Sequence, residues 1–69
     1  MKIICRSKEL ETIRVKKGYS RYSLSIKAGL SKLAVSRIEK GEVTPTPKSA
    51  KKICDALNVE FDEIFSIQE

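Results

Sequence analysis

Histidine is absent from the 69 residues, and cysteine and proline occur only twice each. Without histidine the chain lacks the commonest general acid or base, and it contains no glycine-rich phosphate-binding loop. Cys5 and Cys54 lie far apart in the sequence and match no spacing of metal ligands. We therefore expect no metal, no cofactor and no enzymatic activity. The favoured interpretation of the two cysteines is buried structural thiols; a disulfide is the alternative, although a cytosolic protein would keep both reduced.

Long apolar runs are also missing, and none approaches the length of a transmembrane helix. The first six residues are too short for a signal peptide, so we expect no export and a cytoplasmic location. The length predicts one domain, residues 1–69, with a small core. A helical bundle suits such a chain because its contacts are local.

Acidic residues are scarce over most of the chain. Residues 1–52 carry all 14 lysines and arginines and four acids, a net charge of +10, whereas residues 53–69 carry five acids and no base. A basic body with an acidic end indicates a surface that faces a polyanion and a separate role for the C-terminal part.

Two short helical patterns joined by a tight turn make up residues 20–41. The first is expected from Ser20 to Ala28 and the second from Ser31 to Lys40, with a glycine in the turn between them. Each begins with a serine, whose side chain can accept a hydrogen bond from an otherwise unpaired backbone N–H. Two helices joined in this way form a helix-turn-helix unit, whose second helix enters the major groove of DNA.

Apolar periodicity and end signals indicate three further helices. The first spans Ser7 to Lys17, with Ser7 as its expected N-cap. Another spans Lys48 to Leu57, after the cap-and-proline pair Thr46-Pro47, and Asn58 is expected to end it in a left-handed conformation. Its inner stripe consists of Ala50, Ile53, Cys54 and Leu57. The last helix is short, from Glu60 to Phe65.

The segment from Lys2 to Arg6 is short and β-branched, which is typical of an extended arm or a single strand. A strand needs a partner, and the only other candidate is the tail from Phe65 to Gln68. We expect these two segments to pair, or the arm to pair across a dimer, because Ile3 and Ile4 would otherwise be exposed.

A series of motifs runs in order and without gaps from Leu10 to Phe65. The motifs are Gly18-Tyr19-Ser20-Arg21, Leu24-Ser25, Ala28-Gly29-Leu30-Ser31, Val35-Ser36-Arg37-Ile38-Glu39-Lys40-Gly41, Pro45-Thr46 and Ala56-Leu57-Asn58-Val59. Together they resemble the helix-turn-helix domain of phage repressors and Cro, the Xre-type regulators. The resemblance implies an all-α, compact five-helix fold and a protein encoded by a bacterium or a phage. Two residues depart from the family pattern: Arg21 replaces the usual glutamine, and Glu42 stands where the family tends to be basic.

The outward residues of the second unit helix are the expected DNA contacts, because Val35 and Ile38 point into the core. The expected base contacts are Lys32, Leu33, Ala34, Ser36 and Arg37. Lysine and arginine donate to guanine O6 and N7, and leucine and alanine can touch the thymine methyl group. The expected phosphate contacts are Ser20, Arg21, Tyr22, Ser31, Lys40 and Thr44, which would fix the orientation of the protein on the duplex.

A structural ion pair is implied by the same resemblance. In proteins of this kind, an arginine of the first helix pairs with the glutamate that follows the recognition helix, which gives Arg14 and Glu39 here. The alternative is a solvated surface arginine.

The expected function is a sequence-specific regulator of transcription, a repressor that binds double-stranded DNA as a homodimer on a palindromic operator. One helix reads only a few base pairs, and two half-sites multiply the discrimination. The expected dimer surface consists of Phe61, Ile64, Phe65 and Ile67, with the arm around Ile3 and Ile4 as the alternative. The competing function is an antitoxin-like or adaptor module that binds another protein with the same fold. No small-molecule ligand is indicated.

Overall fold

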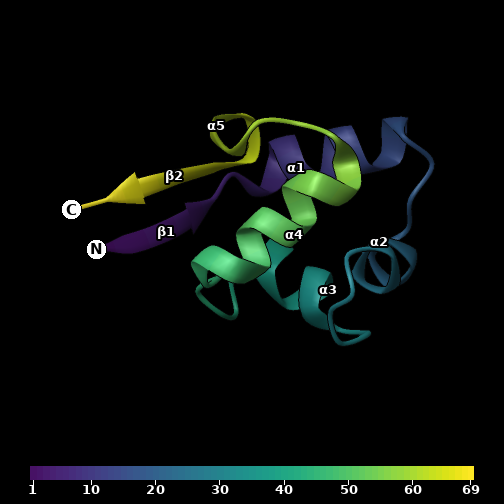
Figure 1. Ribbon diagram of the computed structural model, residues 1–69, viewed down its shortest axis with the longest axis horizontal. Coiled ribbons are helices and arrows are strands. Elements are labelled where there is room, and N and C mark those ends of the chain that lie inside the picture. The colour runs from purple at the N-terminus through teal and green to yellow at the C-terminus, as the bar shows by residue number, and fades with distance from the viewer.

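Five helices and two short strands account for most of the chain in the computed structural model, which describes all residues from 1 to 69 (Figure 1). In chain order the elements are β1 (Lys2–Cys5), α1 (Ser7–Lys16), α2 (Arg21–Lys27), α3 (Ala34–Glu39), α4 (Pro47–Leu57), α5 (Phe61–Ile64) and β2 (Phe65–Gln68). The expected five-helix fold, with a strand at each end of the chain, is confirmed. None of the helices has the length and apolar character needed to cross a membrane.

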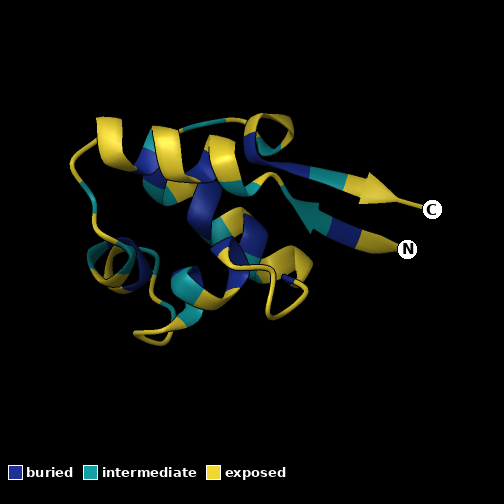
Figure 2. Ribbon diagram, turned by 180° about the vertical axis from the view of Figure 1, so that it is seen from behind, coloured by how far each residue is buried: buried dark blue, intermediate teal, exposed yellow.

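Helix α1 contacts α3 directly, and helix α4 lies across the middle of the molecule in both views, packed against α2 and α5 (Figures 1 and 2). Its expected inner stripe is fully buried, because apolar residues three or four positions apart lie on one helix face. The Thr46 side chain accepts a hydrogen bond from the Ser49 N–H at 3.1 Å, and Pro47 is the first helical residue. Asn58 then ends the helix with φ +57°, as the sequence predicts.

One hydrophobic core joins all the helices. It contains eleven buried apolar residues, Ile3, Leu10, Leu24, Val35, Ile38, Ala50, Ile53, Cys54, Leu57, Ile64 and Phe65. Because α2 contributes one apolar residue to this core and α3 contributes two, the opposite sides of both helices are left for solvent or for a partner.

Strands β1 and β2 pair antiparallel within the chain, in the register Ile3 opposite Ile67 and Cys5 opposite Phe65. Residues that lie opposite each other share one face of the ribbon, and this face packs against the helices through Ile3 and Phe65. The ribbon extends away from the helices along the longest dimension of the molecule, 33 Å, and carries both termini at its end (Figure 1). Ile67 lies near that end and is 51% exposed.

The start of α1 differs from the prediction. Ser7 is the first helical residue and not its N-cap; Arg6 takes the cap position, without a side-chain hydrogen bond. The reason is the strand pair, because the Arg6 N–H donates to the Ile64 carbonyl oxygen at 2.6 Å and extends the bonding from β1 up to the first helical residue. The helix also ends at Lys16, one residue earlier than expected.

Two residues of the expected dimer surface belong to the core instead. Ile64 and Phe65 are both 0% exposed. Helix α5 packs on α1 and α4, and β2 follows it without a loop, with Phe65 on the face that packs against the helices. The expected dimer contacts at these two positions are therefore wrong. Phe61 is half-buried, with its ring 5.4 Å from that of Phe65, so Phe61 and Ile67 are the two of the four that remain accessible.

Both cysteines are thiols, Cys54 buried and Cys5 half-buried, as expected for structural residues. Burial raises the pKa of the Cys5 thiol from 9.0 to about 11, and burial raises the pKa of Cys54 to about 11 as well. Both side chains are therefore protonated at neutral pH.

Candidate nucleic-acid interface

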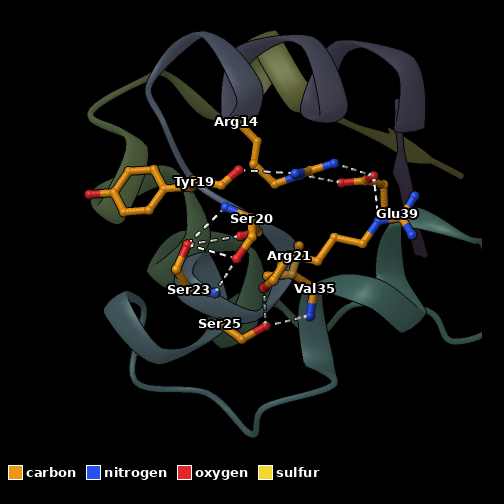
Figure 3. Close-up of polar contacts among 8 residues, drawn as sticks. All are labelled: Arg14, Tyr19, Ser20, Arg21, Ser23, Ser25, Val35 and Glu39. Carbon is orange, nitrogen blue, oxygen red and sulfur yellow. Dashed lines mark hydrogen bonds and ion pairs between the residues drawn. The ribbon is translucent and has the colours of Figure 1, made fainter.

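The helix-turn-helix unit begins at α2, whose N-terminus is closed by a reciprocal pair of serines (Figure 3). The Ser20 side chain accepts a hydrogen bond from the Ser23 N–H at 3.0 Å, and the Ser23 hydroxyl accepts one from the Ser20 N–H at 2.8 Å. Two backbone donors that no helical carbonyl can reach are thereby satisfied. The expected cap at Ser20 is confirmed, although the partner that completes the motif is a serine rather than a glutamate or glutamine.

The turn between α2 and α3 depends on Gly29, which has φ +75°. This left-handed conformation strains residues that carry a Cβ atom, and glycine adopts it without cost. After the turn, the Leu30 N–H donates to the Ser25 carbonyl oxygen at 2.9 Å, and the half-buried Leu30 side chain packs against the core. The chain is thus redirected within three residues toward α3.

Helix α3 begins at Ala34, three residues later than the predicted start at Ser31. No side chain caps it from within, and the Ser31 contribution is its backbone carbonyl, which accepts from the Ala34 N–H at 3.0 Å. The expected side-chain cap at Ser31 is therefore wrong. Residues 31–33 form a turn that leads into the helix, so Lys32 and Leu33 project from that turn.

The cap that α3 lacks is supplied by Ser25 of α2 (Figure 3). Its fully buried hydroxyl accepts a hydrogen bond from the Val35 N–H at 3.0 Å and donates to the Arg21 carbonyl oxygen at 2.9 Å. One side chain therefore joins the two helices of the unit at a defined distance. This role was not predicted from the sequence, where the available signal was a small polar residue beside Leu24 on a face that must be buried.

The outward face of the second helix is arranged largely as predicted. Ser31, Lys32, Leu33 and Arg37 are exposed, Ala34 and Ser36 are half-buried, and Val35 and Ile38 point into the core. Leu33 is 48% exposed, so an apolar side chain lies next to the cations of this surface. The structure thus brings two cations, two hydroxyls and an exposed leucine together on one surface.

Candidate phosphate-contacting groups precede and follow this surface along the chain. Tyr22 is 60% exposed on α2, and Lys40 and Thr44 are exposed where α3 ends and the following loop begins. Ser20 is also exposed, although its hydroxyl is engaged in the cap of α2. These groups come from both ends of the unit, so together they can hold an extended polyanion across it.

Arg14 and Glu39 form the ion pair that the resemblance implies. The Arg14 guanidinium donates from Nε to Oε2 and from Nη2 to Oε1 of Glu39, both at 3.0 Å, and from Nη1 to the Tyr19 carbonyl oxygen at 3.0 Å. Both residues are buried, at 7% and 6% exposure. The pair therefore fixes the end of α3 against α1 and the loop before α2.

Arg21 contacts the same carboxylate, which was not predicted from the sequence. Its Nε donates to Oε1 of Glu39 at 2.9 Å, while its side chain remains 40% exposed (Figure 3). The first residue of α2 and the last residue of α3 are thereby connected directly. No cluster of three or more histidine, cysteine, aspartate or glutamate side chains is placed to hold a metal ion.

Comparison with known proteins identifies similar sequences and a similar structure. The helix-turn-helix family model HTH_3 matches residues 10–64. An uncharacterised HTH-type transcriptional regulator of Bacillus subtilis, YgzD, is 31% identical over 61 residues, which cover 88% of this chain and 92% of YgzD. The HTH-type transcriptional regulator SlrR of the same organism is 39% identical over 56 residues, 80% of this chain, but the match spans 37% of SlrR. The crystal structure of the restriction-modification controller protein C.AhdI from Aeromonas hydrophila superimposes with a TM-score of 0.77 at 28% identity, over 83% of this chain and 86% of that one.

Proposed function

This chain belongs to the Xre/Cro-type helix-turn-helix family of DNA-binding transcriptional regulators, and from that premise we propose that it binds a palindromic operator as a homodimer and represses transcription. The observation that carries the proposal is the outward face of α3 and its leading turn. There, exposed Lys32 and Arg37 flank an exposed apolar side chain on a surface that no other part of the chain covers.

Base recognition in this proposal comes from five residues, Lys32, Leu33, Ala34, Ser36 and Arg37. Because α3 begins at Ala34, Lys32 and Leu33 would reach the bases from the turn that enters the groove first. Arg37 lies one helical turn after Leu33 and can donate two parallel hydrogen bonds to a guanine. Leu33 and the half-buried Ala34 suit a thymine methyl group, which offers only an apolar contact.

Phosphate contacts in this proposal come from Ser20, Arg21, Tyr22, Ser31, Lys40 and Thr44. They come from the start of α2, from the turn before α3 and from the segment that follows α3, which suits groups that set the register of a helix in the groove without reading sequence. The net charge of +10 over residues 1–52 would attract the duplex over a longer range.

A homodimer is proposed because one short helix reads too few base pairs for useful discrimination. Of the expected dimer contacts, Phe61 and Ile67 are the ones that are accessible for pairing. Occupancy of a promoter by such a dimer would exclude the polymerase, which is the simplest route to repression. Action on the DNA of a bacterium or a phage would place it in the cytoplasm.

The test is the selection of duplexes from a random pool, followed by binding measurements with the wild type, Arg37→Ala and Lys40→Ala over a series of salt concentrations. We expect Arg37→Ala to reduce the discrimination between the preferred site and its variants by about 1–3 kcal/mol. Lys40→Ala should weaken binding to all duplexes alike and lower the salt slope by about one. Lys16→Ala on α1 is the matched control, since this exposed lysine lies outside the proposed surface.

If the wild type binds no duplex more tightly than about 1 μM at physiological salt, it shows only the affinity of non-specific binding, and the proposal fails. The adaptor function would then be the better hypothesis, and the same surface would be tested for a protein partner.

A further inference from the structure

The Glu39 carboxylate forms ion pairs with two arginines, although one is enough to neutralise its charge. Arg14 already donates two hydrogen bonds to the carboxylate, and Arg21 donates a third, which Oε1 accepts. Two guanidinium groups and one carboxylate leave this cluster with a net charge of +1. A buried carboxylate needs a partner, but a second cation beside the first is repelled by it and brings no further neutralisation. The charge of Arg21 is therefore available for another anion.

The two arginines are used differently. Arg14 is buried, with a side chain 8% exposed, and all of its guanidinium nitrogens donate within the chain. Arg21 has a side chain 40% exposed and donates to Glu39 through Nε alone. Its two terminal nitrogens make no hydrogen bond to the protein, so the edge of the guanidinium formed by Nη1 and Nη2 is accessible. In Figure 3 the Arg21 side chain reaches across from α2 to Glu39, with its terminal nitrogens beyond the carboxylate.

A guanidinium has two edges that can each contact an oxyanion, and a phosphodiester fits the Nη1–Nη2 edge with two parallel hydrogen bonds. A lysine ammonium has three donors, but they radiate from a single atom, so a lysine here could not offer a phosphodiester the two parallel hydrogen bonds of the Nη1–Nη2 edge. Arg21 also stands at the first residue of α2, beside Ser20 and one residue from the exposed Tyr22. The accessible edge thus lies among the candidate phosphate contacts.

We infer that Arg21 bridges Glu39 and one phosphodiester of the bound duplex, and that Glu39 is a positioning residue that fixes which phosphate Arg21 can reach. This inference rests on the proposed function and adds to it one specific phosphate contact. The bridge would run from the DNA backbone through Arg21 and Glu39 to Arg14 of α1. Because Glu39 is the last residue of α3, the same carboxylate that holds the recognition helix would set the register of the phosphate contact.

The test compares the full-length wild type with Arg21→Lys and Arg21→Gln on the selected duplex, over a series of salt concentrations. Arg21→Gln removes the charge, so we expect binding to weaken about 10- to 100-fold, as for a lost charged hydrogen bond, and the salt slope to fall by about one. Arg21→Lys keeps the charge and loses the second edge, so we expect about tenfold weaker binding with the slope unchanged. Lys27→Gln is the matched control, because it removes one exposed charge from the other end of α2.

A second measurement follows the Arg21 Nε–H by NMR, with and without the duplex. If Arg21 bridges both anions, its Nε–H stays protected from exchange in the complex, because Glu39 still accepts it. An Nε–H that exchanges rapidly in the complex would mean that Arg21 leaves the carboxylate, and the shared role of Glu39 would be refuted.

The outcomes separate this inference from the function on which it rests. A wild type that binds no duplex overturns both. If the wild type binds its site and Arg21→Lys binds equally well, the charge alone is sufficient and the bridge is wrong. If Arg21→Gln leaves the salt slope unchanged, Arg21 contacts no phosphate, and the inference fails while the regulator function stands.

Discussion

The hydrogen bond from the Val35 N–H to the Ser25 hydroxyl should stabilise the start of the recognition helix. Ser25→Ala removes the only side chain that caps α3, and the Val35 N–H is then left in the core without an acceptor. An unsatisfied buried donor costs about 1–3 kcal/mol, and loss of a helix cap costs about 1 kcal/mol. These figures describe the same bond and are not added. The higher helix propensity of alanine within α2 offsets a few tenths of a kcal/mol.

We therefore expect Ser25→Ala to lower the free energy of unfolding by about 1–2 kcal/mol. For a domain of this size, that corresponds to a decrease in Tm of about 5–15 °C. The assay is thermal and urea unfolding followed by circular dichroism, on the purified full-length chain. Amide hydrogen exchange at Val35 gives a local readout, because its N–H should exchange faster once the acceptor is gone.

The control is Ser36→Ala, which makes the same chemical change on α3 at a half-buried serine whose hydroxyl forms no hydrogen bond within the chain. Its free energy of unfolding should stay within about 0.5 kcal/mol of the wild type, because alanine is the better helix former. The reasoning would be refuted if Ser25→Ala matched Ser36→Ala in stability and the Val35 amide stayed protected. The N–H would then have found another partner.

Two further predictions concern buried ionisable groups. Glu39→Gln leaves two arginines without their counter-charge and should lower the free energy of unfolding, measured by urea denaturation, by about 3–5 kcal/mol. Asp55→Asn breaks the exposed ion pair between Lys51 and Asp55, 3.6 Å apart, and should cost about 0.5 kcal/mol at most. Equal losses of stability in the two variants would contradict this prediction. Cys5 and Cys54 should resist alkylation at pH 8 until urea is added, because burial raises each pKa from 9.0 to about 11. As the pH rises, the thiols of the unfolded chain ionise before those of the folded protein. The contribution of the two cysteines to stability is therefore complete below pH 9 and declines between pH 9 and about 11. Alkylation at the same rate in native and unfolded protein would show that the two thiols are not buried.

Much of the secondary structure was predictable because its signals act over one helical turn. The serine cap at Ser20, the cap-and-proline start at Thr46 and the left-handed Asn58 each depend on residues within four positions. The same holds for the inner stripe of α4 and for the turn at Gly29. Residue type also predicted which side of the second unit helix is exposed, since Val35 and Ile38 can only be buried on the opposite face.

The tertiary structure decided what lies between elements. Ser25 caps the N–H of a residue ten positions away, and Arg21 contacts a carboxylate eighteen positions away. Ser31 does not cap α3 as expected, because Ser25 of α2 fills that role. Ile64 and Phe65 look like surface for a partner in a short acidic helix, yet packing on α1 and α4 buries them completely.

Local periodicity thus determined by itself that this chain forms helices and which faces are apolar, because those properties depend on the geometry of a single turn. Which polar side chains satisfy one another depends on distances between elements, and these exist only once the core has packed. The cations of the candidate DNA surface could be named from the sequence, but the carboxylate that positions one of them could be identified only in the folded chain.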